Sequence, residues 1–189
     1  MLFSTLDTIT TKYGFVMEEP QLATYPVGQK YVDAPEVKEI ADQLIKKFRP
    51  ELAGWNIGYA FKAKAPKKED MEVLGMAKKE NDLSSLYSKI DAYIVMPFDK
   101  WVTMDADQKF RVTFHELEHL FPNIEKGTLD LLDHPINEFP SVIRIFGPGQ
   151  ESDVMFIEAY QSFCKDNSTA IDEIQEQRKK SAALDTDDE

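Results

Sequence analysis

All three histidines of this 189-residue chain lie between positions 115 and 134. His115 and His119 enclose Glu116 in the pattern H-E-x-x-H. On an α-helix, residues four apart lie on the same face, one turn apart. Both imidazoles can therefore face one metal ion, and the pattern is typical of helix-borne zinc sites that hydrolyse peptide bonds.

Glu116 lies about 100° round the helix from His115, which puts its carboxylate beside the ion. There it can take a proton from zinc-bound water and pass it to the leaving amine. The metal lowers the pKa of the water and polarises the scissile carbonyl. We therefore predict a zinc-dependent peptidase with Glu116 as its general base.

A catalytic zinc ion needs three protein ligands and one open position. His134 is the remaining histidine, and the glycine-containing connection before it could turn the chain back, so it is the first choice. Glu138 and Glu158 are the carboxylate alternatives. Asp133 could instead orient a ligating imidazole by a hydrogen bond.

Three histidines without a nearby cysteine favour an open catalytic site over a structural one. Arg144 and Tyr160 could stabilise an oxyanion. A solvated arginine and a tyrosine at the edge of the core are the favoured interpretations of these two residues.

The motif needs a helix with its own apolar anchor. Asp105 and Gln108 resemble a capping box at the start of that helix. We expect the helix to run to about Phe121 and to end at Pro122. Its core-facing residues are expected to be Phe110, Phe114, Leu117 and Phe121.

Other segments follow the same kind of pattern. Apolar residues at helical spacing predict a helix from Pro35 to Phe48, and further helices end near Phe146 and Cys164. Pro140 is tolerated only in the first turn of its helix. Strands are expected at 55–61, 71–77 and 90–98, with polar connections at 62–70 and 78–86. The last strand could add a substrate strand at an exposed edge.

Composition limits the class of protein. The chain is 42% hydrophobic, with a net charge of -12 and a pI near 4.7. Such a surface repels phosphates, which argues against a nucleic-acid partner. With the single cysteine Cys164, no signal peptide and no apolar run of about 20 residues, we expect a cytoplasmic protein without a membrane partner. The oligomeric state stays open.

The run from Asp91 to Gly147 resembles the putative phage metallopeptidase family, small H-E-x-x-H proteins of bacteriophages and prophages that are similar to minimal zincins and SprT-like peptidases. In that family the later segment reads like H-D-x-x-E-F, followed by an apolar helix and glycine. Here Pro135 replaces the acidic residue, and Asp133 precedes the histidine. The matching pieces are Ala92–Val95, His115–His119, His134–Phe139, Val142, Arg144 and Gly147.

The resemblance implies His134 as the third ligand, but it does not supply the substrate. From the chemistry of the motif we expect a peptide or protein substrate, and if the chain is phage encoded we expect it to act in the host bacterial cytoplasm. The resemblance also implies an α+β fold, a small zincin-like domain with about three strands packed on the active-site helix. We expect an N-terminal arm at 1–34, this domain at 35–165, and a polar acidic tail at 166–189, helical and then disordered.

Two other functions compete with a peptidase. The net charge of -12 also suits a non-catalytic binding protein with a structural zinc site, acting as a DNA mimic or as an inhibitor of a host factor. A zinc-stabilised virion component without turnover is the other alternative.

Overall fold

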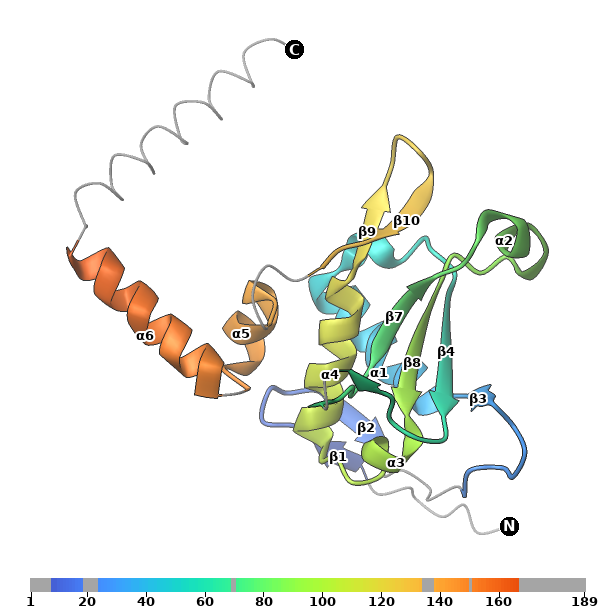
Figure 1. Cartoon of the computed structure of the whole chain (residues 1–189), viewed down its shortest axis with the longest axis horizontal. Coiled ribbons are helices and arrows are strands. Elements are labelled where there is room, and N and C mark those ends of the chain that lie inside the picture. Colours follow the sequence, from blue (N-terminus) through green and yellow to red (C-terminus); the bar gives the residue numbers. More distant parts are fainter. Residues whose placement is uncertain (1–7, 19–23, 69–70, 134–137, 150, 167–189) are drawn as a thin grey trace. The chain divides into compact units, whose positions relative to one another are not determined.

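The computed structural model describes residues 8–18, 24–68, 71–133, 138–149 and 151–166 (Figure 1). The chain separates into two compact units, Met1–Phe146 and Gly147–Glu189. All described strands and the H-E-x-x-H segment belong to the first unit.

A four-stranded sheet forms the centre of the first unit, in the order β3–β4–β8–β7. The central strands β4 and β8 are parallel, and each outer strand is antiparallel to its neighbour. The fold is therefore mixed α+β, with one strand more than expected. The strands are β3 (Tyr31–Asp33), β4 (Ile57–Lys62), β8 (Ala92–Pro97) and β7 (Met76–Lys79).

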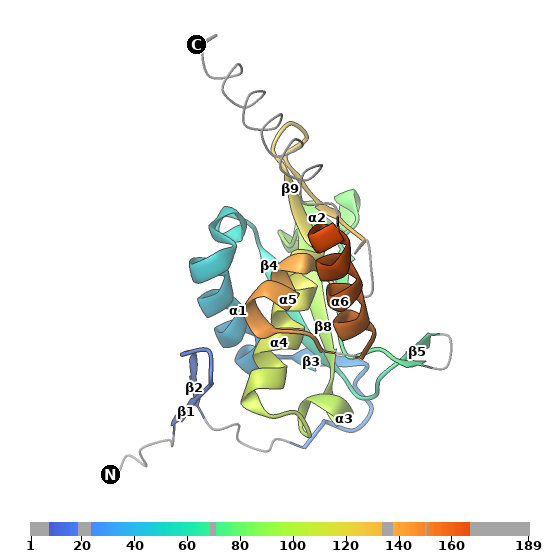
Figure 2. The ribbon, with the colours of Figure 1, turned by 90° about the vertical axis from the view of Figure 1, so that its left-hand side faces the viewer.

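Two helices, α1 (Pro35–Phe48) and α4 (Ala106–Glu118), pack against each other and against the sheet (Figure 2). Val95 of β8 is buried, and so is a row of alternate residues in the two central strands, as expected where helices cover one face of a sheet. The row consists of Tyr59, Phe61, Ala92, Ile94 and Met96. The core therefore lies between the sheet and the helix that carries the motif.

The start of α4 confirms the expected capping box. The Asp105 carboxylate accepts a hydrogen bond from the Gln108 backbone N–H at 2.8 Å, and the Gln108 side chain accepts one from the Asp105 N–H at 3.0 Å. Two backbone N–H groups at the start of the helix are thereby satisfied, which favours a helix that begins here.

The end of α4 differs from the prediction, since the helix ends at Glu118 and not near Phe121. Residues Leu120–Asn123 form β9, which pairs antiparallel with β10 (Thr128–Leu131). Phe121 is 49% exposed, whereas Phe110, Phe114 and Leu117 are at most 1% exposed. Pairing with a strand further along the chain thus overrides the local helical pattern.

Other elements agree with the sequence predictions only in part. The helix Pro35–Phe48 and the strands at β4 and β8 are confirmed, and the predicted strand at 71–77 is split between two short strands. The polar connections were wrong, because they contain a strand and a helix that Asn81 caps by accepting from the Ser84 N–H. The elements concerned are β5 (Lys67–Lys68), β6 (Met71–Glu72) and α2 (Asp82–Ser88).

The proposed free edge on the strand at 90–98 was also wrong. Strand β8 pairs with β4 on one side and with β7 on the other, so both of its edges are occupied. The border strand on this side of the sheet is β7.

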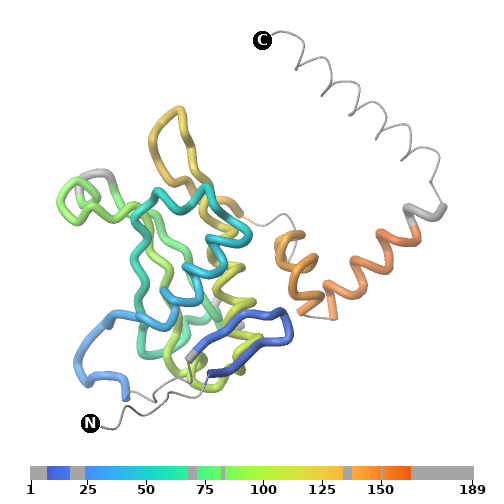
Figure 3. Tube along the Cα trace, turned by 180° about the vertical axis from the view of Figure 1, so that it is seen from behind, coloured from blue at the N-terminus to red at the C-terminus, as the bar shows by residue number. Residues whose placement is uncertain are grey.

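The remaining elements of the first unit are short, and α6 (Glu151–Asp166) belongs to the second unit. A hairpin of β1 (Thr8–Thr10) and β2 (Val16–Glu18) lies beside α1, where the Gln43 side chain donates to the Val16 carbonyl at 2.8 Å (Figure 3). Pro140 is the first residue of its helix, as its geometry requires. The other elements are η1 (Pro50–Leu52), α3 (Phe98–Trp101) and α5 (Pro140–Phe146).

No helix among the described residues is long and apolar enough to span a bilayer. The prediction for the tail concerns residues that, from 167 onward, lie outside the described part of the chain.

Phe110→Ala should lower the free energy of unfolding by about 3–5 kcal/mol, because it empties a fully buried site on α4. Phe121→Ala is the matched control and should change stability by less than about 0.5 kcal/mol, because that ring is half exposed. Urea unfolding followed by circular dichroism measures both. If both variants lost the same free energy of unfolding, Phe121 would be buried as part of α4, and the helix would not end at Glu118.

Candidate active site

The motif lies where α4 ends. His115 is in the last turn of the helix, and His119 is its C-cap residue. Their ring centroids are 5.0 Å apart, with an angle of 74° between the ring planes. The spacing of four residues therefore brings both imidazoles together even though the helix stops between them.

Glu138 holds the first imidazole. Its Oε1 contacts His115 Nδ1 and accepts the Phe139 backbone N–H at 3.0 Å. Its Oε2 accepts from Arg111 Nη2 at 3.2 Å. Because Arg111 and His115 are one turn apart on α4, this one carboxylate joins that face of the helix to the segment before α5.

Leu132 holds the second imidazole through its backbone. The Leu132 carbonyl oxygen lies 2.6 Å from His119 Nδ1, and the Leu132 N–H donates to the His119 carbonyl at 2.8 Å. The β9–β10 hairpin leads the chain from one of these residues to the other. Both rings therefore have an oxygen acceptor at Nδ1, which favours the tautomer with its lone pair on Nε2.

Phe139 packs edge-to-face against both imidazoles. Its ring centroid is 5.4 Å from that of His115 and 4.8 Å from that of His119, and the residue is 7% exposed. One buried aromatic side chain thus limits the rotation of both rings.

Glu116 points toward the sheet and is 4% exposed. A Cβ atom built at Gly75 would lie 2.5 Å from Glu116 Oε1, so the carboxylate occupies the space that a side chain at position 75 would need. The backbone of Ala77, in border strand β7, also hydrogen-bonds to this carboxylate. Burial raises the pKa of the Glu116 carboxyl to about 7, against the opposing effects of His115 and Ala77.

The contact between His115 and Glu138 shifts the pKa values of both side chains. Burial lowers the pKa of His115, but the hydrogen bond to Glu138 and the charges of both glutamates outweigh burial and raise it overall. Burial raises the pKa of Glu138, and the contacts with His115, Phe139 and Arg111 lower it overall. Binding of a cation at the imidazole would displace the second ring proton.

The other sequence candidates are placed as follows. His134 lies outside the described residues. Asp133 and Arg144 are exposed. Glu158 and Tyr160 are exposed on α6 in the second unit, where the tyrosine ring stacks on Phe156. Within the described ranges, no group of three histidine, cysteine or acidic side chains is arranged to hold a metal ion.

No role was predicted from the sequence for Leu132 or Gly75, nor for Arg111, which donates to Glu138. Leu132 acts through its backbone, for which the sequence carries no signal. Gly75 acts by lacking a side chain, and a glycine inside a predicted strand, where backbone or another group can approach closely, was the available clue. Glu138 was named as a possible metal ligand, and its oxygens contact His115 and Arg111.

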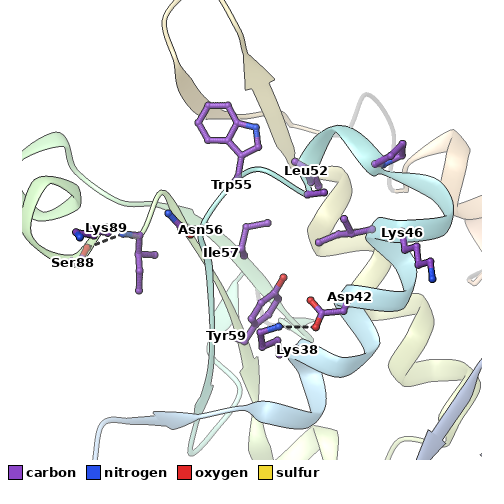
Figure 4. Close-up of a pocket in the computed structure, with 14 residues that line it drawn as sticks. Lys38, Asp42, Lys46, Leu52, Trp55, Asn56, Ile57, Tyr59, Ser88 and Lys89 are labelled. Carbon is purple, nitrogen blue, oxygen red and sulfur yellow. Dashed lines mark hydrogen bonds and ion pairs between the residues drawn. The ribbon is translucent and has the colours of Figure 1, made fainter.

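A hollow of about 840 Å³ lies elsewhere, between α1 and β4 (Figure 4). Lys38 and Asp42 form an ion pair of 2.6 Å beside Tyr59, and Lys46 and Lys89 point to opposite sides. None of the residues lining it belongs to the motif. We therefore place the candidate active site at the end of α4 and not in this hollow.

A family model described as putative phage metallopeptidase matches residues 29–166. No curated protein and no solved structure matches the chain.

The residues described here suit the metal that such a family implies. Two imidazoles lie close together, and each has an acceptor at Nδ1. Such outer hydrogen bonds are the usual means of orienting histidine ligands. They would leave Nε2 of each ring as the ligand atom.

Glu138→Ala should lower the free energy of unfolding of the metal-free chain by about 1–3 kcal/mol, because it leaves the mostly buried Arg111 guanidinium without this carboxylate. Glu158→Ala removes an exposed carboxylate of the same type and should cost less than about 0.5 kcal/mol. Urea unfolding in excess chelator compares them. If Glu138→Ala matched Glu158→Ala, the contacts drawn here for Glu138 would be wrong.

Proposed function

The chain belongs to the putative phage metallopeptidase family, and on that premise we propose that it is a zinc-dependent peptidase that hydrolyses peptide bonds in a protein or peptide substrate. His115 and His119 are the proposed zinc ligands on α4, with His134 as the third. Glu116 is the proposed general base. The zincin-like arrangement, the catalytic domain at 35–165 and action in the host cytoplasm belong to the same proposal.

One observation carries this proposal: two imidazoles whose Nδ1 atoms both contact oxygen acceptors lie beside a buried carboxylate. A histidine pair serving only to stabilise the core would need no such matched orientation. Imidazole nitrogen is a ligand that zinc prefers, and three such ligands leave one position open.

The residues of the chain have separate tasks. A bound zinc ion would supply Lewis-acid chemistry, which polarises a carbonyl and acidifies water. Glu116 takes the proton from the attacking water and delivers it to the leaving nitrogen. Gly75 leaves room for the Glu116 carboxylate, and the backbone of Ala77 hydrogen-bonds to it. The base is therefore oriented before substrate arrives.

Glu138 and Leu132 maintain the tautomer of the two imidazoles by accepting at Nδ1. Phe139 keeps water from one side of both rings, since it is almost fully buried against them. Substrate specificity is left open by these contacts.

Glu116→Gln should retain about one zinc ion per chain and the wild-type melting temperature, yet lose peptide cleavage. The amide is nearly isosteric but cannot accept the proton, which typically costs about 100- to 10,000-fold in rate. Plasma mass spectrometry measures the zinc, and a fluorogenic peptide library measures cleavage.

His134→Ala is the paired variant and should lose most of the zinc. Wild-type protein that binds no zinc after loading and dialysis would contradict the peptidase proposal and favour the acidic-surface binding protein. Cleavage that persists in Glu116→Gln would exclude Glu116 as the base.

Gly75→Ala should lower kcat by about 10- to 100-fold, because the new methyl group takes the place of the Glu116 carboxylate and shifts the base. Unfolding should change little, since the displaced group is the end of a flexible side chain. Gly54→Ala adds a methyl group that meets nothing within 4 Å and is the control. If Gly75→Ala and Gly54→Ala had the same kcat, the position of the Glu116 carboxylate would not matter for catalysis.

A further inference from the structure

The second histidine of the motif is the C-cap residue, at which α4 ends, and it is half-buried. The last carbonyl groups of a helix have no hydrogen-bond partners within it, and helix ends frequently fray. A ligand at this position needs support from outside the helix.

Arg49 supplies that support. Its Nη1 donates to the Leu117 carbonyl at 2.9 Å, and its Nη2 donates to the Leu120 carbonyl at 2.7 Å. One guanidinium group thus binds the backbone on both sides of His119. The fork of two nitrogens is essential to this geometry, because a lysine ammonium is a single point that cannot reach both carbonyls in the same way.

The guanidinium is held in place by its own surroundings. Arg49 is the C-cap residue of α1, and its side chain is 13% exposed. Its Nε pairs with Glu51, and its Nη1 also donates to Glu118 Oε1 at 2.9 Å. A positive charge at the end of α4 is further favoured by the helix dipole.

The network continues to a third helix. Glu118 accepts from Arg49 with one oxygen and from the Ser141 hydroxyl with the other. Arg49, Glu118 and Ser141 therefore connect α1, α4 and α5 at the end of the helix that carries both imidazoles. The Leu132 backbone also contacts His119: its N–H donates to the His119 carbonyl, and its carbonyl oxygen contacts the His119 ring.

We propose that Arg49 is a positioning residue for His119, which fixes the last turn of α4 so that the imidazole keeps its contact with Leu132 and its orientation toward the metal. This inference deepens the proposed function and rests on it. A purely structural cap would stabilise the chain without affecting the ring of His119, and the two roles can be separated.

The experiment compares Arg49→Gln and Arg49→Lys with Leu52→Ala in the full chain. Leu52 is 1% exposed in the turn next to Arg49, so Leu52→Ala destabilises the fold without removing a contact to α4's last carbonyls. Three quantities are measured: zinc affinity by competition with a chromophoric chelator, the visible spectrum of the cobalt-substituted protein, and the tautomer of the His119 ring in metal-free protein by ¹⁵N NMR.

Arg49→Gln should weaken zinc binding about 10- to 100-fold, the usual effect of losing an outer partner of a ligand. It should also alter the cobalt spectrum and lower the population of the Nδ1–H tautomer of His119. Arg49→Lys keeps the charge and most of the thermal stability, but should still weaken zinc binding because it lacks the fork. Leu52→Ala should lower the melting temperature and leave the other three readouts unchanged.

The proposal is overturned if both Arg49 variants behave as Leu52→Ala does, with a lower melting temperature and unchanged zinc affinity and His119 tautomer. Wild-type protein that binds neither zinc nor cobalt would instead remove the proposed function. The tautomer in metal-free protein would then still decide whether Arg49 positions His119.

Discussion

Burial of one face of α4 is the constraint on which the site depends. Phe110, Phe114 and Leu117 are essentially inaccessible to water, and they hold the helix against α1 and the sheet. This contact sets the rotation of the helix about its axis. His115 and His119 then share the remaining face with Arg111, and Glu116 turns toward the sheet border at Gly75. Apolar packing therefore decides which polar side chains meet, and the hydrogen bonds refine a geometry that the core has already imposed.

The arginines near the motif are each paired with a carboxylate. The chain carries 34 acidic and 22 basic residues, yet around the motif each arginine has a defined carboxylate: Arg49 pairs with Glu118, and Arg111 pairs with Glu138. Both pairs are largely shielded from water, where an uncompensated charge would be costly. The acidic excess is thus a property of the outer surface, and it says little about the chemistry at the end of α4.

The sequence predicted those features that depend on residues close together in the chain. The capping box at Asp105, the proline start of α1 and the spacing of His115 and His119 each depend on neighbours within a few residues, and the structure bears out the first two and the helical context of the third. The end of α4 was predicted wrongly because Phe121 fits a helical pattern, while the β9–β10 pairing that captures it involves residues further along the chain. The role of Leu132 could not be predicted, since it acts through a backbone carbonyl, and for Gly75 the glycine within a predicted strand indicated a close approach but not that Glu116 makes it.

The contacts around the two imidazoles also differ in how far they reach along the chain. His119 meets Leu132 at a separation of 13 residues, and His115 meets Glu138 at 23. Arg49 reaches the Leu120 carbonyl across 71 residues. Closing the 13-residue loop costs about 1.5 kcal/mol less chain entropy than closing the 71-residue loop. The orientation of the two imidazoles therefore depends mainly on contacts within one contiguous stretch of chain, whereas the Arg49 contacts make the end of α4 depend on α1, which is distant in sequence.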